Sequence, residues 1–257
     1  MIIVENNTIE EIPFLHLVKE EYRNEALPTC FFVHGFTSAK EHNLHYAYYL
    51  AEKGFRVILP DCLEHGERGT GKTEYELGKR FWNIVIHTIK ELDILKETFA
   101  RDGLIDEERI GLAGTSMGGI VTLGALTQYE WINSAVSLMG NPSYVKLAKA
   151  QLGQLEKMGY ENPFTEGQVE EILSELSRFD LSLQPEKLNG RPLMFWHGKN
   201  DKVVPFQLTY EAYTELLPFY EGREDQLVFL EDQKADHKVS RDGVLKLVDW
   251  FVDHLMA

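Results

Sequence analysis

The sequence predicts an α/β fold in which a mainly parallel sheet is covered by helices on both faces. Short apolar runs of strand length alternate with longer amphipathic stretches along most of the 257 residues. This alternation is typical of parallel sheets, because a helix must carry the chain back between two parallel strands. The length suits one large α/β domain. Hydrophobic residues make up 44% of the chain, which is enough for a core on both sides of such a sheet.

The first two strands are predicted as an antiparallel pair at one edge of the sheet. Apolar runs at residues 2–4 and 12–18 are separated by Asn6 and Asn7, which favour a turn between them. Later strands are compact apolar runs, as expected for strands buried on both faces. The remaining elements are predicted in the order strand 28–33, helix 41–53, strand 55–59, helix 78–101, strand 109–113, helix 117–129, strand 132–138, strand 193–196, helix 206–217, strand 226–230 and helix 243–255.

The longer helices are predicted from apolar residues that recur on one face. In residues 78–101 these recur at steps of three or four residues or their sum, and the last helix shows a similar pattern. Each helix therefore packs one stripe against the core. The positions are Trp82, Val85, Ile89, Leu92 and Phe99 in the first helix and Val244, Val248, Phe251 and Leu255 in the second.

One stretch, residues 141–187, contains no predicted strand and interrupts the alternation. It holds two amphipathic patterns, at 145–155 and 169–179, with a turn predicted at 159–163 between them. We expect a helical cap insertion within a single domain of residues 1–257. An extra packed hairpin is one interpretation. We favour a lid, because ligand sites in open α/β sheets lie at the carboxyl ends of strands, where this insertion emerges.

The strongest local motif is Gly-Thr-Ser-Met-Gly at residues 114–118, followed by Gly119. It fits the G-x-S-x-G pattern and lies between a predicted strand and a predicted helix, as that pattern requires. Glycines permit the sharp, strained turn that holds a serine hydroxyl clear of the sheet. The N-terminus of the following helix favours developing negative charge. Ser116 is therefore the candidate nucleophile.

A serine nucleophile needs a base, and the base needs a carboxylate that orients it. Among nine histidines, His237 alone lies between the last predicted strand and the last helix. Asp201 follows the strand before that. Its rivals Asp232 and Asp236 come after the final strand, which is a less usual origin for the acid. The chain order of serine, acid and histidine then matches one known triad order, and the predicted catalytic triad is Ser116, Asp201 and His237.

Acyl transfer also needs two backbone N–H groups that bind the oxyanion. Met117, next to the candidate nucleophile, is predicted to supply one. The second is expected from the His-Gly-Phe turn at residues 34–36, with Phe36 as the donor and Thr37 as the alternative. Only the backbone matters for this role, so the Phe36 ring is free either to line an acyl site or to pack.

These motifs together resemble the α/β-hydrolase superfamily. The 34–36 turn, residues 114–119, the sequence His-Gly-Lys-Asn-Asp-Lys-Val-Val-Pro at 197–205 and His237 look like small bacterial carboxylesterases related to the prolyl-oligopeptidase-like and dienelactone-hydrolase-like branches. Residues 60–68 also resemble the family's loop P-D-x-x-x-H-G-x-R. The resemblance covers nearly the whole chain and is weakest across 141–187. It implies hydrolysis through an acyl-enzyme without a cofactor, and the lack of a propeller before the hydrolase region argues against an oligopeptidase.

Composition and charge argue against several other classes of protein. A net charge of −15 repels the phosphates of nucleic acid and of anionic lipid, so neither is an expected partner. No apolar run approaches the roughly 20 residues that span a bilayer, and the N-terminus does not resemble a signal peptide. Cys30 and Cys62 make no disulfide framework and are expected as reduced, buried thiols. We therefore expect a cytoplasmic protein.

Two weaker patterns do not predict a site. His42 and His45 lie one helical turn apart beside Glu41, but without a third ligand they do not predict a metal site. Residues 66–73 match the letters of the phosphate loop G-x-x-x-x-G-K-[ST], yet no apolar strand leads into Gly66. Neither a metal nor a cofactor is predicted.

The sequence thus predicts a serine hydrolase that cleaves carboxylic esters of small or medium acyl groups. A peptidase or a thioesterase on the same triad stays open, since the triad does not select the leaving group. The alternative from another class is a non-catalytic ligand-binding protein, which would not need all three triad residues. A small-molecule ester is the expected substrate, and the oligomeric state does not follow from the sequence.

Overall fold

The computed structural model describes residues 1–159 and 161–256 and is centred on an eight-stranded sheet. The strand order is β1-β2-β4-β3-β5-β6-β7-β8. The six strands from β3 to β8 are mutually parallel, whereas β2 pairs antiparallel with β1 and β4. The mainly parallel sheet is therefore confirmed. The strands are β1 Ile2–Ile9, β2 Ile12–Lys19, β3 Leu27–Val33, β4 Arg56–Pro60, β5 Ile105–Thr115, β6 Ser134–Leu138, β7 Leu193–Gly198 and β8 Leu227–Asp232.

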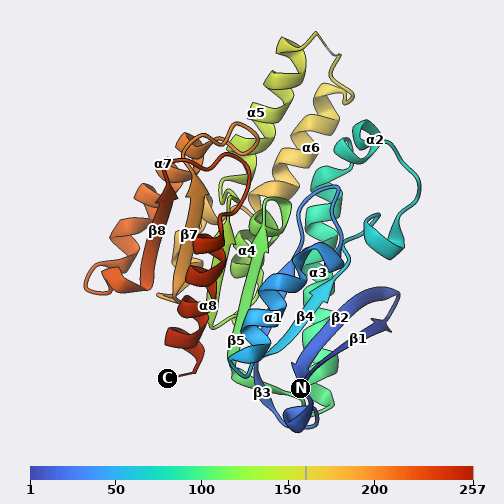
Figure 1. The fold of residues 1–257 in the computed structure, drawn as a ribbon. Helices are drawn as coiled ribbons and strands as arrows, with labels where there is room; N and C mark the ends of the chain where they lie inside the picture. Colours follow the sequence, from blue (N-terminus) through green and yellow to red (C-terminus); the bar gives the residue numbers. More distant parts are fainter. Residues whose placement is uncertain (160, 257) are drawn as a thin grey trace.

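Helices cover both faces of this sheet, as Figure 1 shows. α1 and α8 pack on one face and share one apolar cluster with it, whereas α3 and α4 pack on the other face. This arrangement follows from the alternation of strand and helix along the chain. The helices are α1 Leu44–Glu52, α2 Glu74–Gly78, α3 Phe81–Arg101, α4 Met117–Gln128, α5 Tyr144–Lys157, α6 Glu166–Ser177, α7 Phe206–Leu216 and α8 Arg241–Leu255.

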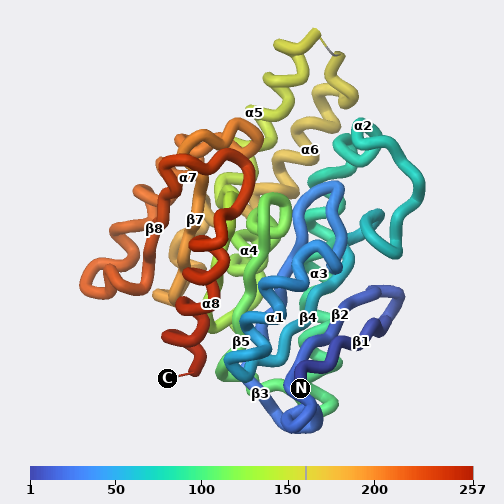
Figure 2. The backbone as a smooth tube through the Cα atoms, in the orientation of Figure 1, coloured from blue at the N-terminus to red at the C-terminus, as the bar shows by residue number. Residues whose placement is uncertain are grey.

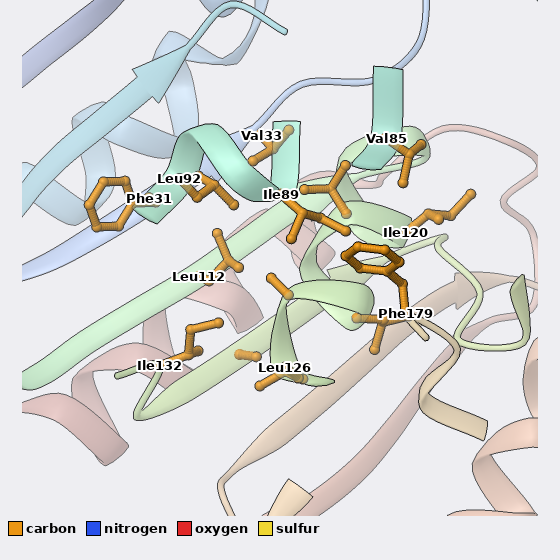
Figure 3. Packing of buried hydrophobic residues seen from close by; sticks show 14 of the residues in the cluster. Phe31, Val33, Val85, Ile89, Leu92, Leu112, Ile120, Leu126, Ile132 and Phe179 are labelled. Carbon is orange, nitrogen blue, oxygen red and sulfur yellow. The ribbon is translucent and has the colours of Figure 1, made fainter. Parts of the chain in front are cut away.

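The apolar cluster under α3 and α4 fixes the position of the β5–α4 turn. Figure 3 shows side chains of β3, β5, α3 and α4 packed together in this cluster. Full burial of one such side chain contributes about 1.5–3 kcal/mol, so the layer strongly resists any displacement of α4. Members of the cluster include Val33 of β3, Leu112 of β5, Ile89 of α3 and Ile120 of α4.

The turn between the first two strands differs from the prediction. Asn6 and Asn7 lie inside β1, and the turn is formed by Glu10 and Glu11, whose φ angles are 46° and 66°. A two-residue turn of this kind needs positive φ at both positions, for which asparagine is favoured over glutamate. Nearly every residue of β2 is buried, so burial sets the register in which β2 pairs with β1. The turn is then formed by the two residues between the paired strands, Glu10 and Glu11.

Two predicted helices differ from the structure at their N-terminal ends. The helix predicted from residue 78 begins at Phe81, after the separate short helix α2, which Thr73 and Glu76 cap with a reciprocal capping box. The helix predicted at 41–53 starts with a 3₁₀ turn at Lys40–Asn43, and α1 follows it. Both differences are local and leave the order of elements as predicted.

The stretch 141–187 forms a helical hairpin of α5 and α6, as the two amphipathic patterns predict. The hairpin rises past the carboxyl ends of the strands, which Figure 2 shows along the backbone trace. Its base is held at Asp180, where Oδ2 accepts the Val145 N–H at 2.9 Å. The predicted turn at 159–163 includes residue 160, which lies outside the described residues.

Across residues 1–159 and 161–256, no helix is both long enough and apolar enough to cross a membrane.

Candidate active site

Ser116 lies at the sharp turn between β5 and α4. Its φ of 55° and ψ of −115° are strained angles for a residue with a side chain. The Ser116 N–H donates to Leu138 O at 2.8 Å, which ties the turn to the end of β6. Two glycines are required by space, since a Cβ on Gly114 would lie 2.3 Å from Gly118 C, and one on Gly118 would lie 2.0 Å from Val33 O. The motif therefore holds the serine clear of the sheet.

Ser116, His237 and Asp201 form a continuous chain of hydrogen bonds. Ser116 Oγ lies 2.8 Å from His237 Nε2, and His237 Nδ1 lies 2.7 Å from Asp201 Oδ2. An ionised carboxylate only accepts hydrogen bonds, so His237 Nδ1 carries the proton and donates it. His237 Nε2 is then free to accept the hydroxyl proton of Ser116. The three residues come from the turns after β5, β7 and β8, and folding brings all three predicted positions together.

The carboxylate of Asp201 is buried and fully hydrogen-bonded. Oδ1 accepts the N–H groups of Val203 at 2.9 Å and Val204 at 3.1 Å. Oδ2 faces His237, and His197 Nε2 lies 3.3 Å away. Burial alone would raise the pKa of Asp201, but hydrogen bonds from His197 and His237 outweigh it and hold that pKa well below its usual range. Asp201 is therefore an anion at neutral pH.

His197 also belongs to this site, in a role that the sequence motifs did not predict. Its side chain is buried at the end of β7, and Nε2 lies 2.9 Å from Val204 O and 3.3 Å from Asp201 Oδ2. Both neighbours are acceptors, so Nε2 carries the proton and donates between them. Nδ1 has no hydrogen-bond partner among the residues that the structure describes. The sequence feature that could have predicted this role is the position of His197, four residues before Asp201 in the His-Gly pair that ends β7.

The predicted oxyanion-hole residues lie beside Ser116. A Cβ on Gly35 would be only 3.5 Å from Ser116 Cβ, so the turn after β3 packs directly on the serine. Phe36 follows this glycine, and Met117 is the buried first residue of α4. Thr37, the alternative donor, is exposed and has a φ of 57°. The donor role of the two amides stays a prediction.

A buried ion pair joins the segments that follow β3 and β4. Lys40 Nζ lies 2.7 Å from Asp61 Oδ2 and 2.7 Å from Glu67 Oε1. Asp61 also accepts the backbone N–H groups of Lys40 and Glu67, each at 3.0 Å. Burial would raise the pKa of Asp61, but the hydrogen bonds from Lys40 and Glu67 lower it. The pair fastens the segment that carries Phe36 to the neighbouring loop.

Residues of the histidine pair and of the stretch that resembles a phosphate loop contact other protein side chains. His42 Nδ1 lies 3.1 Å from Ser38 Oγ, and the part of the chain that the structure describes holds no group of three or more His, Cys, Asp or Glu side chains placed to bind a metal. In the stretch that resembles a phosphate loop, Lys72 Nζ donates to Glu64 Oε1 at 2.9 Å. This lysine is therefore already paired with a carboxylate.

The two cysteines have the predicted state. Cys30 and Cys62 are both free thiols, and both are buried. Burial raises the pKa of the Cys62 thiol to about 12, so this thiol stays protonated and unreactive.

Comparison with known proteins places this geometry in a family. The model of the prolyl oligopeptidase family matches residues 41–257. The chain is 54% identical over 255 residues to a Bacillus subtilis (strain 168) protein named "Putative esterase YitV", covering 99% of this chain and all of that one. It is 29% identical over 257 residues to "Esterase YjfP" of Escherichia coli (strain K12), covering 99% of this chain and all of that one.

A solved structure shares the fold across its whole length. TT1662 from Thermus thermophilus superposes with a TM-score of 0.78 at 22% identity, and the match covers 100% of this chain and 99% of that one. Together with the mainly parallel sheet and the serine turn at the end of β5, these matches show that the chain belongs to the prolyl oligopeptidase family and has the α/β-hydrolase fold.

Proposed function

We propose that this protein is a carboxylesterase that hydrolyses esters of small or medium acyl groups, with Ser116, His237 and Asp201 as its catalytic triad. The observation that carries the proposal is the unbroken hydrogen-bonded chain from Ser116 Oγ through the imidazole to the Asp201 carboxylate. Two relatives aligned over 99% of this chain carry esterase in their names, which favours an ester over other acyl compounds.

In the proposed reaction, Ser116 Oγ attacks the ester carbonyl carbon while His237 Nε2 takes the hydroxyl proton. The carbonyl oxygen becomes an oxyanion, which the backbone N–H groups of Phe36 and Met117 bind. The bond to the alcohol then breaks, and His237 returns its proton to the leaving oxygen. A water molecule gives a proton to the same imidazole and attacks the acyl-enzyme. Ser116 leaves with that proton, and the carboxylic acid is released.

The decisive test compares the wild type with Ser116→Ala on p-nitrophenyl acetate, butyrate and octanoate. We expect hydrolysis by the wild type and a loss of at least about 10³-fold in kcat for the variant, because no acyl-enzyme forms. A fluorophosphonate probe should label the wild type and leave the variant unlabelled. Equal turnover by both proteins would remove Ser116 from the reaction.

A peptidase or thioesterase is the second candidate, and the family match is the observation that favours the peptidase. The triad alone does not distinguish an alcohol, an amine or a thiol as the leaving group, because residues outside the triad select it. A panel of aminoacyl anilides and acyl thioesters, assayed beside the p-nitrophenyl esters, distinguishes the three activities by their kcat/KM values. A larger kcat/KM for an anilide or a thioester than for every ester would replace the esterase assignment.

We propose that the α5–α6 hairpin acts as a lid within a single hydrolase domain and that the substrate is a small molecule. We also propose a cytoplasmic location, which the two unpaired thiols support, because disulfides form mainly in oxidising compartments.

A further inference from the structure

We infer that a strip of three aromatic side chains binds the acyl group of the ester substrate, and that this acyl group is an apolar chain of several carbon atoms. The three residues are Phe36, Phe81 and Trp82. We call these three residues the aromatic strip. The inference rests on the proposed esterase function and deepens it, because it names the class of acyl group that the site takes.

The rings of the aromatic strip touch one another in sequence. The ring centroids of Phe36 and Phe81 are 5.6 Å apart, and those of Phe81 and Trp82 are 5.2 Å apart. Both pairs meet edge to face, which is a favourable geometry for aromatic rings. All three side chains are half-buried and pack on the apolar cluster beneath them. The strip therefore keeps apolar surface open to a ligand while its inner side is held by the core.

The strip runs from the candidate nucleophile toward the cap. Phe36 lies on the turn that packs against Ser116. Phe81 and Trp82 are the first two residues of α3, and this end of α3 lies on the side of the molecule where the α5–α6 hairpin rises (Figure 1). Trp82 contacts Tyr144 of α5, with 5.0 Å between ring centroids. Its Nε1 also donates to Gln151 Oε1 of α5 at 3.0 Å. These contacts with α5 hold the Trp82 ring in place.

The proposed chemistry decides which part of the ester meets the strip. His237 must protonate the leaving alcohol, so the alcohol lies on the side of the imidazole. His237 follows β8, the strand at one edge of the sheet. Phe36 follows β3, and β3 and β8 lie on opposite sides of β5 in the strand order. The acyl group is bonded to the same carbonyl carbon and extends away from the alcohol. It is therefore directed toward the aromatic strip.

The aromatic strip predicts how kcat/KM changes with the length of the acyl chain. Each methylene group that leaves water for an apolar surface strengthens binding about fourfold. We expect an acetyl group to meet the Phe36 ring alone and an octanoyl chain to extend along the Phe81 and Trp82 rings as well. We expect kcat/KM of the wild type to rise from p-nitrophenyl acetate through butyrate to octanoate, with the leaving group held constant. A series that falls steadily with chain length would overturn the inference.

The variants Trp82→Ala and Phe81→Ala test the strip directly. Each should lower the ratio of kcat/KM for octanoate to kcat/KM for acetate by about tenfold, because the long chain loses contact surface that the acetyl group never used. Trp82→Phe keeps a ring and should lower the ratio less. The matched control is Tyr48→Ala, which removes a ring that is 47% exposed on α1, on the opposite face of the sheet. It should leave the ratio unchanged.

The outcomes separate this inference from the function on which it rests. Hydrolysis of all three esters with the same chain-length ratio in the wild type, Trp82→Ala and Phe81→Ala would overturn the strip and leave the esterase intact. No hydrolysis and no fluorophosphonate labelling by the wild type would overturn both. If an alanine variant does not fold, as judged by circular dichroism, Trp82→Phe and the wild-type series still decide the result.

Discussion

At the residue scale, the carboxylate of Asp201 shows how one side chain is held for its task. Its two oxygens face two backbone N–H groups and two imidazoles, so its orientation does not depend on water. A carboxylate fixed in this way keeps the His237 ring in the orientation and tautomer that Ser116 needs. The contact from His197 is the part of this arrangement that a single substitution can remove without touching the triad.

We expect His197→Leu to lower kcat by about tenfold or more with little change in KM. The leucine removes the donor to Asp201 Oδ2, so the carboxylate loses one of the contacts that hold it, and the effect falls on the proton transfer rather than on ester binding. His197→Gln can offer an amide N–H near the same place and should restore part of kcat. Steady-state kinetics on p-nitrophenyl butyrate measure both variants, and equal kcat for leucine and glutamine would argue against a positioning role.

At the scale of elements, the candidate site is assembled from turns at the carboxyl ends of several parallel strands. The segment after β3 and the loop after β4 meet at the buried pair of Lys40 and Asp61. A Cβ on Gly66 would lie 2.0 Å from Asp61 Oδ1, so this loop can approach the pair only with glycine. The pair therefore sets the geometry of the segment that carries Phe36.

Asp61→Ala should destabilise the protein by about 3 kcal/mol, because the buried Lys40 ammonium keeps only the partly exposed carboxylates of Glu41 and Glu67 and two backbone N–H groups lose their acceptor. The double variant Lys40→Met/Asp61→Leu removes both charges and should recover the part of that loss that comes from the buried ammonium, while the two backbone N–H groups still lack their acceptor. Urea unfolding of the wild type, both single variants and the double variant measures the coupling. If the double variant lost as much stability as the sum of the two single variants, the pair would have no special role.

At the scale of the whole molecule, two histidines link stability to pH. Burial and the nearby Arg56 guanidinium lower the pKa of His16 to about 4. Burial likewise lowers the pKa of His34 to about 4, and its Nε2 accepts the Cys62 N–H at 3.0 Å, a bond that only an unprotonated nitrogen can accept. Unfolded histidine takes up a proton near pH 6.5, so the unfolded chain binds more protons below that pH.

The free energy of unfolding should therefore fall as the pH drops from about 6.5 toward 4, by up to about 1.4 kcal/mol per pH unit for each histidine. His16→Gln replaces one of them far from the triad. Its loss of stability between pH 7 and pH 5 should be smaller than that of the wild type by about 1–2 kcal/mol. Urea unfolding at both pH values checks this, and an unchanged pH dependence would show that His16 is not held neutral in the fold.

The sequence alone determined the order of elements and the three residues that meet at the site. Alternating apolar runs and amphipathic stretches are local signals, because each depends on neighbours within a few residues. The strained turn at Ser116 is local as well, since glycines at fixed spacing permit it. His237 and Asp201 could be placed because the carboxyl ends of parallel strands lie at one edge of the sheet, so positions after different strands converge.

Only the tertiary structure decided features that depend on contacts between distant segments. The turn at Glu10 and Glu11 follows from the register of β2, which burial against the rest of the sheet sets. The donation from His197 to Asp201 depends on a loop path that no spacing rule predicts. The aromatic strip joins a turn after β3 to the start of α3, more than forty residues later, and those rings meet only when both elements pack on the same core.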